Sequence, residues 1–405
     1  LVSFVPFQLH SLGALPPFFM SMLPYFHDES YELVKVHLLN QGVPLEQIWS
    51  DQPWGFNFLL FWLGIDDLLS GRLLVVCFSL ILLVAFGFLT RYPIGGRAIN
   101  TVVLIAGLIS SYKFFWASTV LMKEIPVLAL IVLSFALVGK RPLLSAIVFA
   151  ASLLFKQTGL FLIPVWFLLR RKVSPDSIPI ILGAIVTVAL SFPSTHLKAI
   201  EYKWDYQYTG LHLFTELFTI NLVFIILGLI SIVSCIKKRE YAPIAWLAIS
   251  ITRFLLITPV WEHYAPHLMI PIFWMIAIAY DKNWIVTSAI VAQSILNMAT
   301  LEPRIPLYHP VIEFAKQNQG VSIITDYPYL IHEFDMSTPG EAAILSLKRV
   351  NTYQLGSNSI AKIADENKPD IMFFARFPQF ITEYDGYTTF EYDAGGSLYL
   401  RNDLL

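Results

Sequence analysis

Roughly the first 300 residues consist of long apolar runs with few charges between them, and this pattern restricts the folds open to the chain. Of the 405 residues, 56% are hydrophobic and 14% are charged, whereas a soluble globular domain carries about 25% charged residues. A membrane span needs about 20 apolar residues, or somewhat fewer in a sheltered helix. The sequence therefore predicts an α-helical polytopic membrane protein with about eleven transmembrane helices, near residues 1–24, 71–90, 98–112, 119–138, 142–155, 158–170, 177–192, 214–236, 241–259, 264–280 and 284–300.

Basic residues in the short loops set the predicted orientation of these helices. Lys and Arg gather in alternate loops, near residues 91–97, 140–141, 170–172 and 237–239, which the positive-inside rule places in the cytoplasm. The acid-rich loop at 25–65, with juxtamembrane helices, is then extracytoplasmic. Leu1–Leu23 lacks a basic stretch followed by a cleavage site, so we expect a first membrane helix there rather than a signal peptide. The predicted location is a multi-pass protein of the cell or plasma membrane.

The character of the sequence changes after residue 303. The remaining residues have ordinary charge and contain short β-like runs, such as VSIITDY, DIMFFARF and SLYLRN, with a helical stretch between them. Alternating strand and helix signals are typical of a small α/β domain. We therefore predict a transmembrane domain at 1–303 and a small extracytoplasmic α/β domain at 304–405.

Several functional classes are disfavoured by composition. The net charge of −2 and the lack of a Lys/Arg cluster argue against a nucleic-acid partner. Cys77 and Cys235 both lie in apolar runs, where a thiol behaves as a small apolar group. Neither a disulfide framework nor a metal-binding spacing is present among them.

The densest group of acids lies near the start of the chain, in the stretch FHDESYELVKVHLLNQGVPLEQIWSDQPWG. Carboxylates are costly in hydrocarbon, so Asp28, Glu29 and Glu32 belong in a loop or a polar cavity. Taken alone, they fit a solvated loop, or a helix whose N-cap is Asp28. They also fit a reactive centre, and the residue types do not separate these interpretations.

The order of motifs in this stretch resembles the first outer loop of the C-type (GT-C) glycosyltransferase superfamily, in particular the protein O-mannosyltransferases and the aminoarabinose transferases of lipid A. An acidic pair, Asp28-Glu29, is followed by a helix, then by Gly42-Val43-Pro44 and Asp51-Gln52-Pro53-Trp54. Trp54 stands where the family has a second Pro, and Leu45 where it has Tyr. Further matches follow in order at Gly71-Arg72-Leu73, Glu124-Ile125-Pro126, Phe155 to Gly159 and His263 to Pro266.

The resemblance implies a membrane glycosyltransferase that moves a sugar from a polyprenyl-phosphate carrier to an acceptor hydroxyl at the outer membrane face. The acceptor class, whether protein, lipid or glycan, stays open, as do the sugar and the carrier. Asp28 matches the catalytic acid and is expected to act as general base, a role worth about 10²–10⁴-fold in rate. Glu29 is expected to orient the loop or to bind sugar hydroxyls. Direct attack at the anomeric carbon would invert its configuration.

The departing phosphate needs cationic groups where its charge accumulates. Lys156 lies between two apolar runs and Arg253 lies inside one, where a guanidinium is costly unless it faces a polar cavity. Both are candidate phosphate ligands, although Lys156 also fits a side chain that reaches the membrane interface. Glu124 matches a second acid of the family and would position the acceptor or a divalent ion. It also fits an interfacial charge paired with Lys123.

Two histidines open the run after residue 262. His263 and His267 stand four residues apart, a spacing that places both on one helical face. A metal site lacks an evident third ligand, so contact with the membrane interface or with the carrier head is favoured over zinc. A divalent metal stays open as a cofactor. Tyr264 is expected to contact the sugar or to lie among interfacial aromatic residues. The loop at 193–213, with Trp204 and Asp205, fits a carbohydrate surface and also a helix resting on lipid headgroups.

Two other classes of function fit the same composition. A transporter or flippase of lipid-linked or small polar substrates would show paired inverted halves and acids near the membrane midplane. The sequence shows no repeat. A non-catalytic membrane subunit would use its C-terminal domain for binding. Loss of sugar transfer in Asp28→Asn, with folding and lipid binding kept, would favour the enzyme over both.

Overall fold

The structure, a computed structural model, describes residues 27–50, 52–91, 98–111, 113–171, 174–190, 204–279, 284–299, 311–351, 355–392 and 395–404. The chain forms two compact units. Unit 1 comprises Leu1–Met22, Arg72–Ser191 and Lys203–Arg304. Unit 2 comprises Leu23–Gly71, Phe192–Tyr202 and Ile305–Leu405. Residues 1–24, predicted as the first membrane helix, lie outside the described residues.

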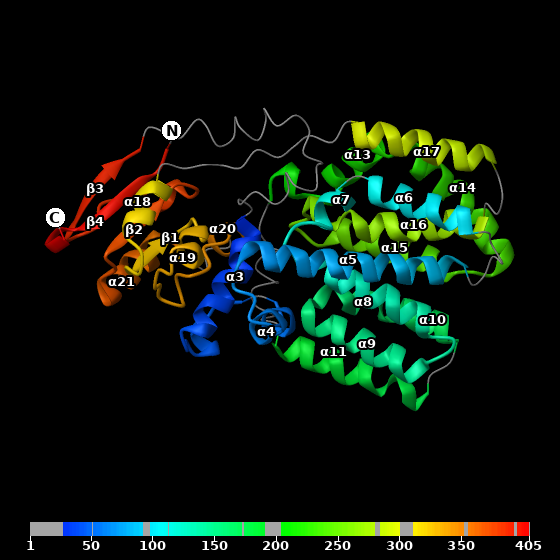
Figure 1. Cartoon of the computed structure of the whole chain (residues 1–405), viewed down its shortest axis with the longest axis horizontal. Coiled ribbons are helices and arrows are strands. Elements are labelled where there is room, and N and C mark those ends of the chain that lie inside the picture. Colours follow the sequence, from blue (N-terminus) through cyan, green and yellow to red (C-terminus); the bar gives the residue numbers. More distant parts are fainter. Residues whose placement is uncertain are drawn as a thin grey trace. The chain divides into compact units, whose positions relative to one another are not determined.

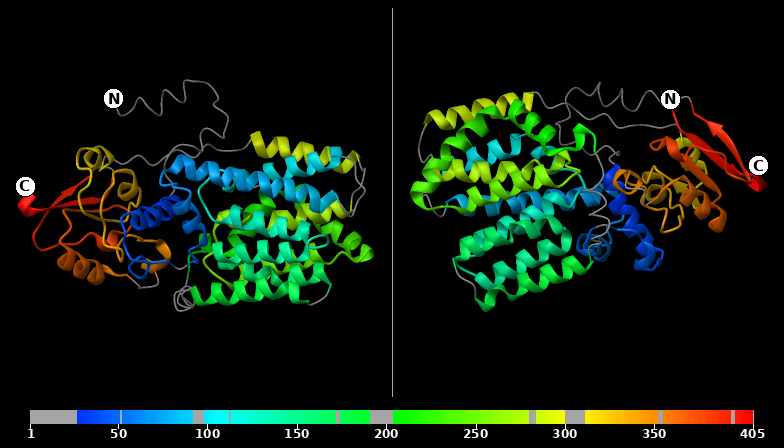
Figure 2. Two further views of the ribbon diagram at one scale, coloured as in Figure 1. Left: turned by 60° about the horizontal axis from the view of Figure 1, so that its bottom comes forward. Right: turned by 180° about the vertical axis from the view of Figure 1, so that it is seen from behind.

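Unit 1 is a helical bundle (Figures 1 and 2). Helix α8 packs against α9, α9 against α11, α14 and α15 against α16, and α6 against α17. The helices are α5 (Leu68–Arg91, whose first turn belongs to unit 2), α6 (Ala98–Ser110), α7 (Phe114–Ala117), α8 (Glu124–Leu137), α9 (Pro142–Phe155), α10 (Ile163–Arg170), α11 (Ile178–Leu190), α13 (Gly210–Ile220), α14 (Leu222–Lys238), α15 (Ala242–Leu256), α16 (Pro266–Ala279) and α17 (Trp284–Ala299). Short 3₁₀ turns η2 (Gln157–Leu162), η3 (Pro175–Ser177), η4 (Tyr206–Tyr208) and η5 (Glu262–Tyr264) connect them.

The prediction of about eleven transmembrane helices is wrong. In the described part of the chain, one helix, Leu68–Thr90, is long and apolar enough to cross a membrane. The pair α13 and α14 meets the same test only if it is taken as one span, and it is bent by 101°. Within the described residues, the other apolar runs form shorter helices. The multi-pass membrane location and the inside–outside assignment of the loops therefore lose their basis and are wrong as well.

The physical reason is that many apolar runs form core helices of the bundle. In α16 every residue from Pro266 to Ile278 is buried, and the helix is 14 residues long. An apolar stretch of about 10–14 residues is more often a buried core helix than a span. Other helices keep one apolar face outward, such as α11 with Ile181, Leu182 and Ile185. The composition is thus explained by a core that is apolar all round and by outward apolar faces.

The break between α13 and α14 is held by buried amides. Asn221 lies at the break, and its side-chain oxygen accepts a hydrogen bond of 2.8 Å from Asn297 in α17. The same Asn297 amide donates to the carbonyl of Ser110 at 3.0 Å. Gln293 donates to the Asn297 oxygen at 2.6 Å and to the carbonyl of Ile220 at 2.9 Å. These bonds satisfy carbonyls that the ends of α6 and α13 leave without helical partners.

Unit 2 contains a four-stranded sheet in the order β1-β2-β4-β3. Strand β1 (Ile323–Thr325) pairs with β2 (Ile371–Phe374) in parallel, and β4 (Ser397–Arg401) pairs antiparallel with both β2 and β3 (Tyr387–Glu391). The strands β1, β2 and β4 lie in the three β-like runs of the sequence. The helices are α3 (His27–Asn40), α4 (Gly55–Trp62), α18 (Val311–Gln317), α19 (Tyr329–Glu333), α20 (Leu347–Asn351) and α21 (Ser357–Asn367), with 3₁₀ turns η1 (Leu45–Gln47), η6 (Pro378–Phe380) and η7 (Asn402–Leu404).

The two faces of the sheet bury two separate apolar cores. In β2, Ile371 and Phe373 join a core with residues of α3, α18 and α19. Met372 and Phe374 point to the other face and join a core with residues of α20 and α21. This division follows from the alternation of side chains along a strand. The central strand β2 is therefore apolar throughout, as expected of a strand covered on both faces.

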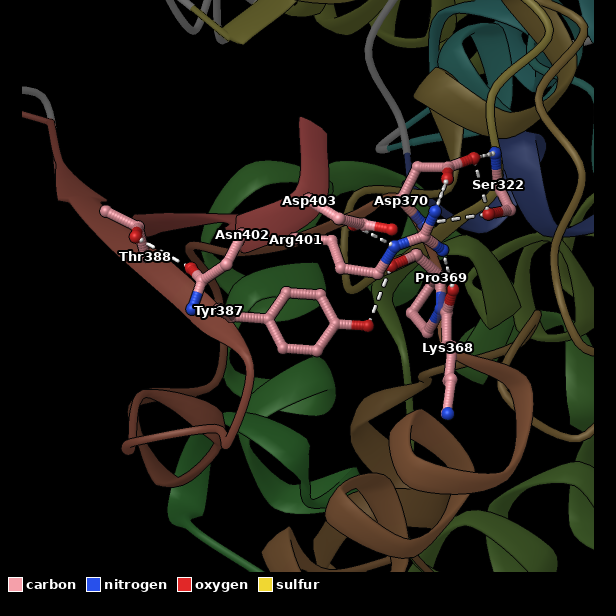
Figure 3. A network of polar contacts seen from close by, with 9 residues as sticks. All are labelled: Ser322, Lys368, Pro369, Asp370, Tyr387, Thr388, Arg401, Asn402 and Asp403. Carbon is pink, nitrogen blue, oxygen red and sulfur yellow. Dashed lines mark hydrogen bonds and ion pairs between the residues drawn. The ribbon is translucent and has the colours of Figure 1, made fainter. Parts of the chain in front are cut away.

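A polar network joins the ends of the strands in unit 2 (Figure 3). Asp370 accepts hydrogen bonds from the backbone N–H and the hydroxyl of Ser322, at 2.9 and 2.8 Å, and pairs with Arg401 at 3.1 Å. Arg401 also pairs with Asp403 at 2.6 Å. Burial alone would raise the pKa of Asp370, but the bonds from Ser322 and the charge of Arg401 outweigh it and lower this pKa. The network fixes the start of β2 against the start of β1.

The acid-rich stretch is mainly a helix of unit 2 and not a loop of the first domain. Helix α3 buries Tyr31, Val34 and Leu38 in one core with the sheet, at the i, i+3, i+7 spacing of a helical face. Glu32 accepts a hydrogen bond of 2.7 Å from the Asn57 amide in α4. The predicted boundary at 303/304 lies beside the start of the last segment of unit 2, but the sequence did not associate residues 25–65 with that segment.

Candidate functional site

The centre of the candidate site in unit 1 is an ion pair between Glu124 and Lys156. Glu124 is the first residue of α8, where the partial positive charge of a helix N-terminus favours a carboxylate. Lys156 follows α9 in an extended conformation and donates from Nζ to Oε1 of Glu124. The two side chains are 5% and 3% exposed. A buried charge pair of this kind is strongly destabilised when one partner is removed.

The same carboxylate oxygen has a second contact. Nε2 of His263, in η5, lies 3.2 Å from Oε1 of Glu124. Glu124 therefore has two potential donors on one oxygen, a lysine from the α9–η2 junction and an imidazole from η5. These contacts bring together the start of α8, the α9–η2 junction and η5, which are distant from one another in sequence.

Two cations lie over one aromatic ring beside this point. Nζ of Lys156 is 4.9 Å and Cζ of Arg253 is 5.1 Å from the ring centroid of Tyr264. Phe254 stacks on Tyr264 at 5.8 Å with an interplanar angle of 8°, which fixes the ring. Cation–π contacts stabilise such charges by about 0.5–2 kcal/mol each. Among the described residues, no carboxylate lies within 4.0 Å of Arg253.

His267, in the first turn of α16, completes a cluster with Glu124, Lys156, Arg253, His263 and Tyr264. It is 2% exposed, and its ring meets those of Phe254 and Tyr264 edge-on at 6.2 and 6.4 Å. Its buried Nε2 has no hydrogen-bond partner among the described residues. Burial, followed by the charges of Arg253, Lys156 and His263, holds the pKa of His267 well below its usual range. Burial and the neighbouring charges therefore favour the neutral form of His267.

Aromatic side chains flank the cluster. The rings of Trp116 and Trp261 lie 6.4 and 6.5 Å from that of His263, and Trp261 is nearly parallel to it, at 12°. Tyr208 contacts Trp261 at 5.0 Å and Trp204 at 5.7 Å. Rings grouped in this way present flat apolar faces, with polar groups at their edges. The apolar face of a pyranose can pack against such a surface.

A second ion pair lies close to these aromatic residues in sequence, and it is less buried. Nζ of Lys113 is 2.6 Å from Oε2 of Glu262, with side chains 20% and 37% exposed. Because this pair neutralises itself, it adds no net charge. The central groups, by contrast, carry one carboxylate against the charges of Lys156 and Arg253, so the cluster has an excess of positive charge.

The predicted catalytic acids lie in unit 2. Asp28 is the second residue of α3, and its side chain lies outside the described residues. Glu29 is buried in the same helix. Lys123, predicted beside Glu124, is buried at the residue before α8. Among the described residues, no group of three His, Cys, Asp or Glu could hold a metal ion.

The structure therefore brings together five predicted residues and one that the sequence singled out only for its spacing: Glu124, Lys156, Arg253, His263, Tyr264 and His267. Sequence reasoning missed Trp116 and Trp261 as neighbours of His263. Both tryptophans occur just outside apolar runs, and this position is the only sequence feature that could have marked them as site residues. Comparison with protein-family models, curated proteins and solved structures gave no match for this chain.

Proposed function

We propose that this protein is a glycosyltransferase that moves a sugar from a polyprenyl-phosphate donor to an acceptor hydroxyl with inversion at the anomeric carbon. The observation that carries the proposal is the excess of positive charge around Tyr264, where the cations are the buried Lys156 and the half-buried Arg253. Lys156 and Arg253 face one ring, Arg253 has no carboxylate within 4.0 Å among the described residues, and Nε2 of His267 is unpartnered. Such a site suits an oxyanion.

In the proposed reaction the resemblance supplies the general base, and the cluster supplies the groups that stabilise the leaving phosphate. Asp28 removes the proton of the acceptor hydroxyl, whose oxygen forms the new bond to the anomeric carbon. The bond from that carbon to the phosphate oxygen breaks at the same time, and the electron pair leaves with the phosphate. Lys156 and Arg253 stabilise the charge that collects on the leaving group. The rings of Trp261 and Tyr208 are proposed to contact the sugar, and Glu29 to support α3 around Asp28.

The resemblance of Asp28-Glu29, Glu124-Ile125-Pro126 and His263 to Pro266 to the C-type glycosyltransferases supports the choice of reaction. The cluster supports the choice of a phosphate leaving group. The chemical identity of the sugar and of the acceptor is left to experiment.

The proposal is tested with the purified full-length chain and short-chain isoprenyl phosphates that carry mannose, glucose or aminoarabinose. Serine-containing peptides, lipid A and oligosaccharides serve as acceptors, and mass spectrometry detects the glycosylated product and the free isoprenyl phosphate. Asp28→Asn should abolish transfer while donor binding remains. A chain that binds donors but releases no isoprenyl phosphate would favour a binding or transport function instead.

Arg253→Met gives a sharper test of the phosphate site, because it removes a cation without leaving a paired carboxylate behind. Loss of a charged hydrogen bond of about 1.5–3 kcal/mol corresponds to a fall of about 10- to 100-fold in kcat/KM for the donor. Arg141→Met, at an exposed position before α9, is the matched control and should leave kcat/KM unchanged. Equal kcat/KM in the two variants would exclude Arg253 from donor binding.

A further inference from the structure

Among the described residues of the cluster, His267 alone has a buried side-chain nitrogen without a hydrogen-bond partner. The side chain is 2% exposed, and its Nε2 has no hydrogen-bond partner among the described residues. Leaving a buried polar atom unpaired is costly, because the atom loses its hydration without gaining a hydrogen bond. Such an atom in a native protein calls for an explanation, such as a bound water or ion or a catalytic role. The unpaired atom lies in the cluster that carries excess positive charge.

The groups around His267 disfavour its protonated form. Arg253 comes from α15, Lys156 from the α9–η2 junction, and His263 and Tyr264 from η5. Glu124 of α8 is engaged by Lys156 and His263. Helix α6, which packs against α16, has no titratable residue. The titratable residues of α14 lie near the end of α16 away from His267, where Cys235 and Lys238 contact the carbonyls of Met275 and Ile278. The charges that act on His267 are thus mainly cationic.

We propose that His267 takes up a proton from solvent when an oxyanion enters the cluster, and then donates a hydrogen bond from Nε2 to that anion. The proton from solvent forms one new ring N–H bond, and no other covalent bond forms or breaks in this step. The anion offsets the charges of Arg253 and Lys156, which otherwise oppose a third positive charge. Because an imidazolium makes a stronger hydrogen bond to an anion than a neutral ring does, protonation and anion binding promote each other.

This inference deepens the proposed function and rests on it only for the identity of the natural anion. A sugar-carrying polyprenyl phosphate is a diester with one negative charge, whereas the released polyprenyl phosphate is a monoester that can carry two. His267 would therefore favour the product over the donor while the product carries two negative charges. It would act as a residue that discriminates between the two phosphate states.

The test measures proton uptake when sulfate binds to the full-length chain. Sulfate is chosen because it does not itself titrate near neutral pH. Isothermal titration in buffers with different ionisation enthalpies gives the number of protons taken up per sulfate. We expect uptake by the unmodified chain, and a sulfate affinity that weakens by as much as about tenfold per pH unit as pH rises. Dimethyl phosphate, a monoanion that does not titrate, should bind with less uptake.

His267→Gln keeps a polar amide but cannot titrate, so it should bind sulfate without proton uptake. The matched control is His212→Gln, because His212 lies in α13 of the same unit, 28% exposed and beside Glu216. Proton uptake by the His212→Gln variant should equal that of the unmodified chain. Uptake that persists in His267→Gln and disappears in His263→Gln would overturn the proposal, as would binding without uptake in the unmodified chain.

A second measurement does not depend on the folding of a variant. The rise in the unfolding temperature of the unmodified chain at a fixed sulfate concentration should become larger as pH falls. A rise that is independent of pH would also overturn the proposal. Sugar transfer without coupled protonation would remove this inference and leave the proposed function intact. Sulfate binding coupled to proton uptake, in a chain that transfers no sugar, would support this inference and remove the proposed function.

Discussion

The properties of the candidate site depend on one carboxylate that two basic side chains share. Glu124 binds Lys156 and His263 through a single oxygen, with 3% of its side chain exposed. In such surroundings a lysine cannot recover its hydration when its partner is lost. Glu262 has the same chemical group and also pairs with a lysine, but 37% of its side chain is exposed. The two glutamates therefore form a matched pair that differs mainly in burial.

Glu124→Gln should lower the free energy of unfolding of unit 1 by about 3 kcal/mol, because it leaves the ammonium of Lys156 buried without a counter-charge. Glu262→Gln should change it by less than about 1 kcal/mol, since water screens the exposed pair with Lys113. Denaturant unfolding at neutral pH, followed by tryptophan fluorescence, measures both. Equal losses in the two variants would mean that burial does not set the energy of these pairs.

At this scale the sequence was informative where a charge stood inside an apolar run. Lys156 and Arg253 were recognised because a charged side chain in such a run needs a special reason, and both belong to the cluster. The proximity of Trp116 and Trp261 to His263 could not be predicted, because it depends on how three separate segments meet. The pairing of Glu124 with Lys156, 32 residues further along the chain, was missed for the same reason.

At the scale of elements, the break at Asn221 and the helix α3 show two ways in which tertiary contacts decide local structure. The run from 214 to 236 was predicted as one helix, but the structure ends α13 at Ile220 and starts α14 at Leu222. Asn221 alone does not require the break, since asparagine is only a weak helix former. The amides of Asn297 and Gln293 supply the contacts that stabilise it, and they come from a helix that is distant in sequence.

Asn297→Leu should destabilise unit 1 by about 3 kcal/mol, because Asn221, Gln293 and the carbonyl of Ser110 lose buried partners together. Ser294→Ala is the control on the same helix. The Ser294 hydroxyl is buried without a partner among the described residues, so its removal should change the stability by less than about 0.5 kcal/mol. Thermal unfolding and hydrogen exchange at the start of α14 report both. A larger loss in Ser294→Ala than in Asn297→Leu would contradict this account of the break.

At the scale of the whole molecule, composition predicted helices correctly and their role wrongly. The apolar runs that the structure describes are helical, but helices such as α8 and α16 are 14 residues long. Hydropathy averaged over a run does not separate a core helix from a span, because both are apolar all round. The sequence also did not predict that residues 23–71 belong with the C-terminal segment. The reason is that α3 contacts the sheet through residues that are distant in sequence.

The two-unit organisation leads to a prediction about cooperativity. Leu38 in α3 is fully buried in the core that α3 shares with the sheet, whereas Leu45 in η1 is 39% exposed. Leu38→Ala should cost about 2–5 kcal/mol through lost contacts and a residual cavity, and Leu45→Ala should cost much less. If unit 2 unfolds as one cooperative body, hydrogen exchange in Leu38→Ala should speed up in α19, β1 and β2, some 300 residues further along the chain. Peptides from α8 and α16 should keep their rates. Faster exchange confined to α3 would show instead that the N-terminal segment frays independently of the sheet.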